Sequence, residues 1–176
     1  MRSFVIGGGY VGLPSAVCYA HRGIHVTIVE IDKQKRDLIA DGISPIDEPR
    51  VAELLVTGLA AGLIDVDDIV RSWPRSAGPE DLHVVFLCVG TPTGGGEFGH
   101  AADLTALLSA AQSASDALKA ADKIILGIRS TVPPGTAAEV ARRTGRTVVS
   151  NPEFLREGTA IDDFLNQTRV VLGGPG

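Results

Sequence analysis

The stretch Phe4-Val5-Ile6-Gly7-Gly8-Gly9-Tyr10-Val11-Gly12-Leu13-Pro14 passes from a short apolar run, through glycines, into a helix-compatible sequence. The apolar run predicts a buried strand, and the residues from Gly12 onward predict a helix. The spacing G-x-G-x-x-G lets Gly7 form a tight turn, lets backbone at Gly9 approach a pyrophosphate, and lets the helix pack closely at Gly12. Free N–H groups and the dipole at the helix start favour bound phosphate. Pro14 lies where its missing N–H costs least.

A second run, His25-Val26-Thr27-Ile28-Val29-Glu30, is β-branched and ends in a carboxylate. Glu30 follows Gly12 by 18 residues, near the distance at which an acidic side chain meets the adenosine ribose of a dinucleotide. Asp32 is the competing candidate. A carboxylate there accepts hydrogen bonds from the ribose hydroxyls and repels the 2′-phosphate of NADP, so the pattern favours NAD. The structural alternative is that both carboxylates are solvated charges at a strand end.

The composition excludes several classes of protein. A chain of 176 residues with 44% apolar content and a mean hydropathy of +0.20 is expected to form one domain over residues 1–176. The net charge of −5, without charge clusters, predicts no nucleic-acid or membrane partner. No apolar run is long enough to span a bilayer, and we expect a cytoplasmic protein. Cys18 and Cys88 lie in apolar runs, which predicts buried side chains without a catalytic or disulfide role, and no metal site is expected.

Strand alternates with helix along the rest of the chain. Residues 71–82 contain two prolines and no periodicity, which predicts an exposed loop. Thr136-x-x-Glu139 has the spacing of a capping box at a helix start. We expect helices over 33–40, from Pro49 to the glycines at 58–62, over 104–118 and 136–143, and strands over 83–89, 123–128, 147–150 and 169–172.

This alternation predicts an α/β fold, a doubly wound and mostly parallel sheet of the Rossmann type. In such sheets ligands bind beyond the carboxyl ends of the strands. The segments that follow predicted strands should therefore line one crevice, and they are 7–12, Glu30, 89–93, 130–131 and 151–158.

Several separate stretches resemble the N-terminal NAD-binding domain of the nucleotide-sugar dehydrogenases of the UDP-glucose and GDP-mannose type. The resemblance covers nearly the whole chain, and its last two stretches serve no generic need of a Rossmann fold. The matching stretches are 7–14, Ser44-Pro45-Ile46-Asp47-Glu48-Pro49, Val89-Gly90-Thr91-Pro92-Thr93, Ala102-Asp103-Leu104, Ser130-Thr131-Val132-Pro133-Pro134-Gly135-Thr136 and Asn151-Pro152-Glu153-Phe154-Leu155-Arg156-Glu157-Gly158-Thr159-Ala160-Ile161.

The resemblance implies oxidation of the C6 hydroxymethyl of a nucleotide-linked hexose to a carboxylate. The reaction would use two NAD and one water and pass through an aldehyde and an enzyme-bound thioester. UDP-glucose, giving UDP-glucuronate, is the first candidate substrate. A UDP-N-acetylhexosamine and GDP-mannose are the alternatives.

The resemblance also implies roles for individual residues. Thr131 and Glu153 resemble the positions that handle the catalytic water or proton, and a carboxylate can act there as general base. The substrate would be bordered by Glu153, Phe154, Leu155, Arg156 and Glu157. NAD would be contacted by Gly7, Gly8, Gly9, Tyr10, Val11, Gly12, Glu30, Lys35, Val89, Gly90, Thr91, Pro92, Thr93, Ser130 and Glu157. The structural alternatives are that Glu153 and Glu157 are acids near a helix start and that 130–133 is a polar turn.

The sequence also departs from the family pattern. The family's nucleophilic cysteine and its accompanying lysine and asparagine belong to a central helix and a C-terminal domain, which are absent from residues 1–176. We therefore expect a fragment or truncated product that is inactive alone and monomeric or weakly associated, whereas the full-length enzyme is expected to be a homo-oligomer. Smaller departures are Arg129 in place of lysine, Glu30 in place of aspartate, and Gln167-Thr168 in place of Pro-Asp.

Two other functions stay open from the sequence. A stand-alone NAD-binding sensor or regulatory module would share every cofactor residue without turnover. A β-hydroxyacid-type dehydrogenase shares the Rossmann start, but those enzymes lack the pattern of 151–161.

Overall fold

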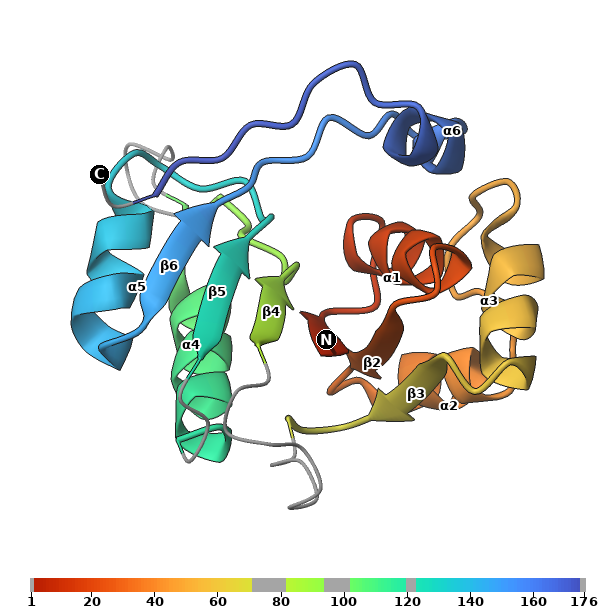
Figure 1. The fold of residues 1–176 in the computed structure, drawn as a ribbon, viewed down its shortest axis with the longest axis horizontal. Coiled ribbons are helices and arrows are strands. Elements are labelled where there is room, and N and C mark those ends of the chain that lie inside the picture. The colour runs from red at the N-terminus through yellow and green to blue at the C-terminus, as the bar shows by residue number, and fades with distance from the viewer. Residues whose placement is uncertain (1, 71–81, 94–101, 120–122, 175–176) are drawn as a thin grey trace.

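The computed structural model describes residues 2–70, 82–93, 102–119 and 123–174. Its described strands form one parallel sheet of six strands in the order β3-β2-β1-β4-β5-β6 (Figure 1). This order, reversing direction between β1 and β4, is that of a doubly wound dinucleotide-binding sheet and confirms the predicted fold class. The strands are β1 (Arg2–Ile6), β2 (His25–Val29), β3 (Ile64–Asp67), β4 (His83–Leu87), β5 (Ile124–Ile128) and β6 (Thr147–Ser150).

Helices cover both faces of the sheet, and the sheet separates the apolar core into two clusters. Alternation along β1 builds both, since Phe4 and Ile6 belong to the cluster under α4 and α5, and Val5 to the cluster under α1, α2, α3 and α6. The helices are α1 (Gly12–His21), α2 (Lys33–Ala40), α3 (Val51–Ala60), α4 (Thr105–Ala117), α5 (Thr136–Thr144) and α6 (Ala160–Leu165).

The strand register aligns the carboxyl ends of neighbouring strands. Ile6 pairs with both Val29 and Leu87, and Leu87 pairs with Ile128. Ile128 in turn pairs with Ser150. The loops that follow these strands therefore meet at one edge of the sheet, as the sequence predicted.

Two local predictions are wrong, and two short elements were missed. Residues 169–172 are not a strand; they are exposed, and only the neighbouring Gly173 makes an antiparallel bridge to Ser150. The capping box does not form, because α5 is capped by Gly135 in a left-handed conformation and the Glu139 carboxylate binds Arg142 and Arg143 instead. The short elements β3 and α6 were not predicted. Of the predicted loop at 71–82, residues 71–81 lie outside the described residues.

No helix in the described ranges is both long and apolar enough to cross a membrane.

Candidate functional site

Two of the three motif glycines of the turn after β1, Gly7 and Gly12, lie where close contacts exclude a side chain. Gly7 has φ +105°, and a Cβ on it would lie 2.7 Å from the carbonyl oxygen of Cys88. A Cβ on Gly12 would lie only 1.8 Å from the carbonyl oxygen of Gly7. A Cβ on Gly9, by contrast, would meet no atom within 4 Å. The turn therefore packs against β4 on one side and stays open at Gly9, where a pyrophosphate can approach the backbone.

Glu30 is buried behind this turn and holds it in shape. One carboxylate oxygen accepts the N–H of Gly8 at 2.8 Å, and the other accepts the N–H of Asp32 at 2.9 Å. The Asp32 side chain instead caps α2, accepting the N–H groups of Gln34 and Lys35. Each Glu30 oxygen retains a second lone pair that can accept a ribose hydroxyl. This arrangement favours Glu30 over Asp32 as the ribose carboxylate, and Glu30 is no solvated strand-end charge.

A cavity of about 430 Å³ opens beside Glu30, between α4 and the ends of β1, β2 and β4. Its rim carries two apolar side chains that are largely exposed, Ile31 (84%) and Ile69 (53%). An apolar slot of this kind suits a flat heteroaromatic ring. Sequence reasoning missed residues 68–70 and the lining residues from α4. Lys35, which was predicted to contact NAD, does not line the cavity. The lining is Ile6, Gly7, Val29, Glu30, Ile31, Asp68, Ile69, Val70, Val89, Ala106, Ser109, Ala110, Ser113 and Ala117.

Ala106 offers a direct test of this cavity, because it is exposed on α4 and lines the slot. An indole at this position fills the slot without disturbing the core, so we expect Ala106→Trp to weaken NAD binding at least about tenfold and to leave Tm unchanged. Ala52→Trp, on the exposed face of α3, is the matched control. Equal NAD affinities of the two variants by calorimetric titration would contradict the assignment.

The loops after β4 and β5 are tied together by hydroxyl groups. Thr91 Oγ1 donates to the carbonyl of Thr131 at 2.6 Å. Ser130 Oγ donates to the carbonyl of Val89 at 2.6 Å. Because these protons are already committed, Thr91 and Ser130 could meet a cofactor only as acceptors or through their backbone. The candidate segments 89–93 and 130–131 are thus brought together, with the Thr131 side chain exposed.

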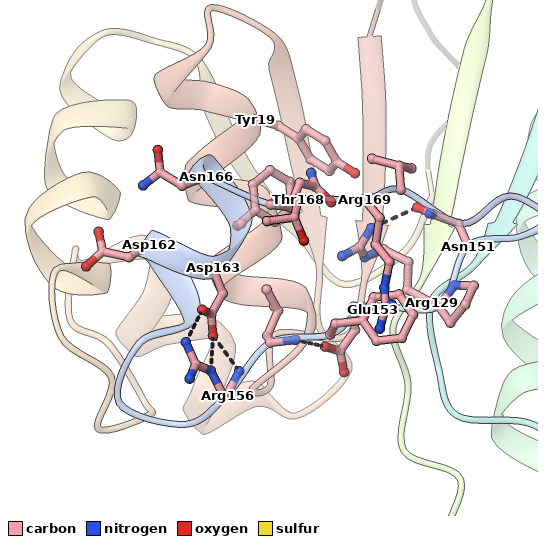
Figure 2. A pocket seen from close by; sticks show the side chains of 16 residues that line it. Tyr19, Arg129, Asn151, Glu153, Arg156, Asp162, Asp163, Asn166, Thr168 and Arg169 are labelled. Atoms are coloured by element: carbon pink, nitrogen blue, oxygen red, sulfur yellow. Dashed lines mark hydrogen bonds and ion pairs between the residues drawn. The ribbon is translucent and has the colours of Figure 1, made fainter.

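A second cavity, of about 820 Å³, lies at the same edge, and the segment 166–170 forms part of its lining (Figure 2). The candidate substrate residues Glu153, Phe154, Leu155 and Arg156 line it, whereas Glu157 and Thr131 do not. Asn151 and Pro152 belong to the segment 151–158 that the sequence predicted in the crevice, whereas sequence reasoning missed the remaining lining residues, because no motif links them to this segment. The other lining residues are Tyr19, Arg129, Asn151, Pro152, Asp162, Asp163, Phe164, Asn166, Gln167, Thr168, Arg169 and Val170.

Glu153 is half-buried in this wall, and its carboxylate accepts the N–H of Leu155 at 2.5 Å. Its remaining lone pairs can take a proton from water. Arg156, three residues on, is bound by Asp163 through both its guanidinium and its backbone N–H. The guanidinium beside Asp163 holds the pKa of that carboxyl well below its usual range. Hydrogen bonds therefore fix the lining segment 153–156 at Glu153 and at Arg156.

Arg129 forms the floor of the second cavity. It is buried, donates from Nη1 to Asn151 Oδ1 at 2.8 Å, and lies 5.6 Å from the centroid of the Phe164 ring. Asn151 Nδ2 donates in turn to the carbonyl of Val171 at 3.1 Å. Within the described residues no carboxylate forms an ion pair with Arg129. These hydrogen bonds link the ends of β5 and β6 to the segment 166–174, which returns from α6 alongside the segment that leaves β6 (Figure 1).

The two cysteines are buried, as predicted. Burial raises the pKa of the Cys18 thiol and of the Cys88 thiol to about 12. At pH 8 a thiol with such a pKa is only about one part in ten thousand thiolate. We therefore expect both to be inert to a disulfide reagent in the folded chain and both to react after unfolding in denaturant. Rapid modification of either thiol before unfolding would contradict this.

The sheet order, the glycine turn and the buried carboxylate after β2 together define a dinucleotide-binding domain of the doubly wound class. The model of the UDP-glucose/GDP-mannose dehydrogenase family, NAD binding domain, matches residues 1–175, and the chain belongs to this family. Its cofactor is therefore NAD.

Individual relatives agree with the family. A UDP-glucose 6-dehydrogenase of Rhizobium meliloti (strain 1021) is 39% identical over 183 residues, which cover 100% of this chain and 40% of the relative. A UDP-glucose dehydrogenase from the hyperthermophilic archaeon Pyrobaculum islandicum has a solved structure similar to this one, with a TM-score of 0.84 and 31% identity over 100% of this chain and 41% of that chain. A ternary complex of a Pseudomonas aeruginosa GDP-mannose dehydrogenase also has a TM-score of 0.84, with 33% identity over 99% and 41%. The chain thus spans about 40% of the length of these relatives.

Proposed function

We propose that this chain supplies the NAD-binding half of a nucleotide-sugar 6-dehydrogenase that oxidises the C6 hydroxymethyl of a UDP-hexose to a carboxylate. The observation that carries the proposal is the joint presence, at one sheet edge, of the NAD turn and a second cavity walled by Glu153 to Arg156. UDP-glucose is the first candidate substrate, since two UDP-glucose 6-dehydrogenases are 39% and 40% identical to this chain. GDP-mannose is the second, because a GDP-mannose dehydrogenase is 33% identical.

In the proposed mechanism each residue of this chain has a limited task. Bound NAD would supply the hydride acceptor. Glu30 and the open backbone at Gly9 bind and orient the cofactor, while Ser130 and Thr91 hold the loops that border it. Glu153, which lines the second cavity, would accept a proton from water, and the family resemblance assigns Thr131 to the handling of that water. The domain division that we propose, residues 1–176 for the cofactor and a further domain for the sugar nucleotide, follows from these tasks.

The nucleophile of the thioester step is proposed to come from outside these residues. Both cysteines are buried and their thiol pKa values are raised to about 12, so neither supplies a thiolate near neutral pH. We accordingly propose that residues 1–176 alone bind NAD without turnover.

The test is an assay of the complete gene product with NAD and, separately, UDP-glucose, UDP-N-acetylmannosamine and GDP-mannose. We expect two NADH for each sugar nucleotide consumed, with the fastest turnover on UDP-glucose. Oxidation of 3-hydroxy acids instead would overturn the proposal. NAD binding without turnover on any sugar nucleotide would favour a regulatory module.

We also propose a cytoplasmic homo-oligomer for the complete enzyme, with residues 1–176 monomeric or weakly associated. Size-exclusion chromatography with light scattering tests this. A tight dimer of residues 1–176 would contradict it.

A further inference from the structure

Glu48 makes a connection that its position in the sequence does not suggest. It lies in the connector between α2 and α3, yet its side chain is buried, with 6% exposed. One carboxylate oxygen accepts the N–H of Gly158 at 2.8 Å, and the other accepts the N–H of Ala160 at 2.9 Å. These donors lie 110 and 112 residues away along the chain. A single carboxylate thus fixes the downstream end of the segment that walls the second cavity.

Arg50 adds a second connection from the same connector to α6. Its guanidinium donates to Asp162 Oδ1 at 2.6 Å. Arg50 also has φ +67°, and it is the only non-glycine residue in the described ranges with a positive φ. Such a conformation is unfavourable for a side chain with a Cβ, so it persists where surrounding contacts hold it. Glu48 and Arg50 thus hold neighbouring parts of one segment, Gly158 to Asp162.

The wall is held at its other end by different residues. Asn151, where the segment leaves β6, is bound by the buried Arg129. Between the two attachments, Asp163 binds Arg156. Beneath α6, the Ile161 side chain is buried in the cluster shared with α1. The position of Glu153 to Glu157 relative to the NAD turn is therefore set by Arg129 upstream and by Glu48 downstream.

We propose that Glu48 is a positioning residue that fixes the substrate wall, residues 153–156, against the cofactor-binding part of the domain. It does not touch the cavity itself, whose lining does not include it. Its effect passes through the backbone of 158–160 to the wall. That the wall binds substrate rests on the proposed function, whereas the attachment of the wall by Glu48 does not.

Glu48→Gln removes one of the two hydrogen-bond acceptors and leaves the size of the side chain nearly unchanged. An amide has one oxygen, so it can accept only one of the two N–H groups and turns an NH₂ toward the other. Glu48→Asp keeps the charge but is one methylene shorter and cannot span both donors. In the complete gene product we expect each variant to raise KM for the sugar nucleotide about tenfold, with KM for NAD within about twofold of the unsubstituted enzyme. Glu53→Gln, an exposed acid on α3, is the matched control and should change neither KM.

Equal rises in both KM values, or an unchanged KM for the sugar nucleotide, would overturn the role of Glu48. If the unsubstituted protein oxidises no sugar nucleotide, the proposed function fails and hydrogen–deuterium exchange of residues 1–176 decides the positioning of the wall. Faster exchange in Glu48→Gln confined to 153–165 would support it. Unchanged exchange there, or acceleration spread equally over the sheet, would overturn it.

Discussion

Gly12→Ala is expected to destabilise the chain by about 3 kcal/mol, which corresponds to a fall of about 10 °C in Tm for a chain of this size. The cause is a contact between backbone and the new methyl group. The Cβ would lie 1.8 Å from the carbonyl oxygen of Gly7, and neither group can rotate away. The start of α1 must then separate from the turn after β1. Thermal unfolding followed by circular dichroism measures the change.

Gly9→Ala is the informative partner of Gly12→Ala, because the two glycines belong to one motif but have opposite surroundings. No atom lies within 4 Å of a Cβ at Gly9, so the variant should keep its Tm. The methyl group would instead occupy the approach of the pyrophosphate, and NAD affinity should fall about a hundredfold. An unchanged Tm for Gly12→Ala, or unchanged NAD affinity for Gly9→Ala, would contradict these roles.

Glu30→Gln is expected to have the next largest effect, on both the turn and the cofactor. The buried carboxylate accepts two backbone N–H groups, and an amide can accept only one of them. An unpaired buried N–H costs about 1–3 kcal/mol, so Tm should fall. The loss of a charged acceptor for the ribose should weaken NAD binding about a hundredfold and reduce the preference for NAD over NADP.

Asp32→Asn is the matched control for Glu30→Gln. Asparagine caps a helix about as well as aspartate, so α2 should retain its stability. If Glu30 is the ribose carboxylate, NAD affinity should stay nearly constant in this variant. A larger loss of affinity for Asp32→Asn than for Glu30→Gln would assign the ribose to Asp32.

The elements that the sequence predicted well are those whose local pattern agrees with their environment. The strand at β4 is a mostly apolar run that is buried on one face and partly buried on the other, and α2 begins at a good cap, Asp32. β3 escaped prediction because its sequence Ile-Asp-Val-Asp is short and half acidic, as suits an edge strand. α6 escaped because a six-residue helix has little intrinsic stability, and its partners, Glu48 and the core around Ile161, are distant in sequence.

At 169–172 the error is opposite, because the sequence predicted a strand that the structure does not contain. Its β-branched run predicted a strand, but the bridge that the structure shows to β6 lies at Gly173, outside this run, and Val170 and Leu172 are 59% and 67% exposed. Local propensity here was not matched by a partner strand.

The candidate site was predictable only where a motif carries its own chemistry. The glycine turn and Glu30 have a spacing that a dinucleotide requires, and the structure brings them together. The lining from α4, the floor at Arg129 and the attachment at Glu48 depend on tertiary contacts between segments without a shared motif. No periodicity along the chain indicates such contacts.

The central claim is that the turn at Gly7 to Gly12 and the carboxylate of Glu30 form a site selective for NAD. A calorimetric titration of residues 1–176 with NAD and with NADP tests it most directly. We expect one NAD per chain and NADP at least about tenfold weaker, because the 2′-phosphate would meet the buried carboxylate. Equal affinity for the two dinucleotides, or binding of neither, would contradict the claim.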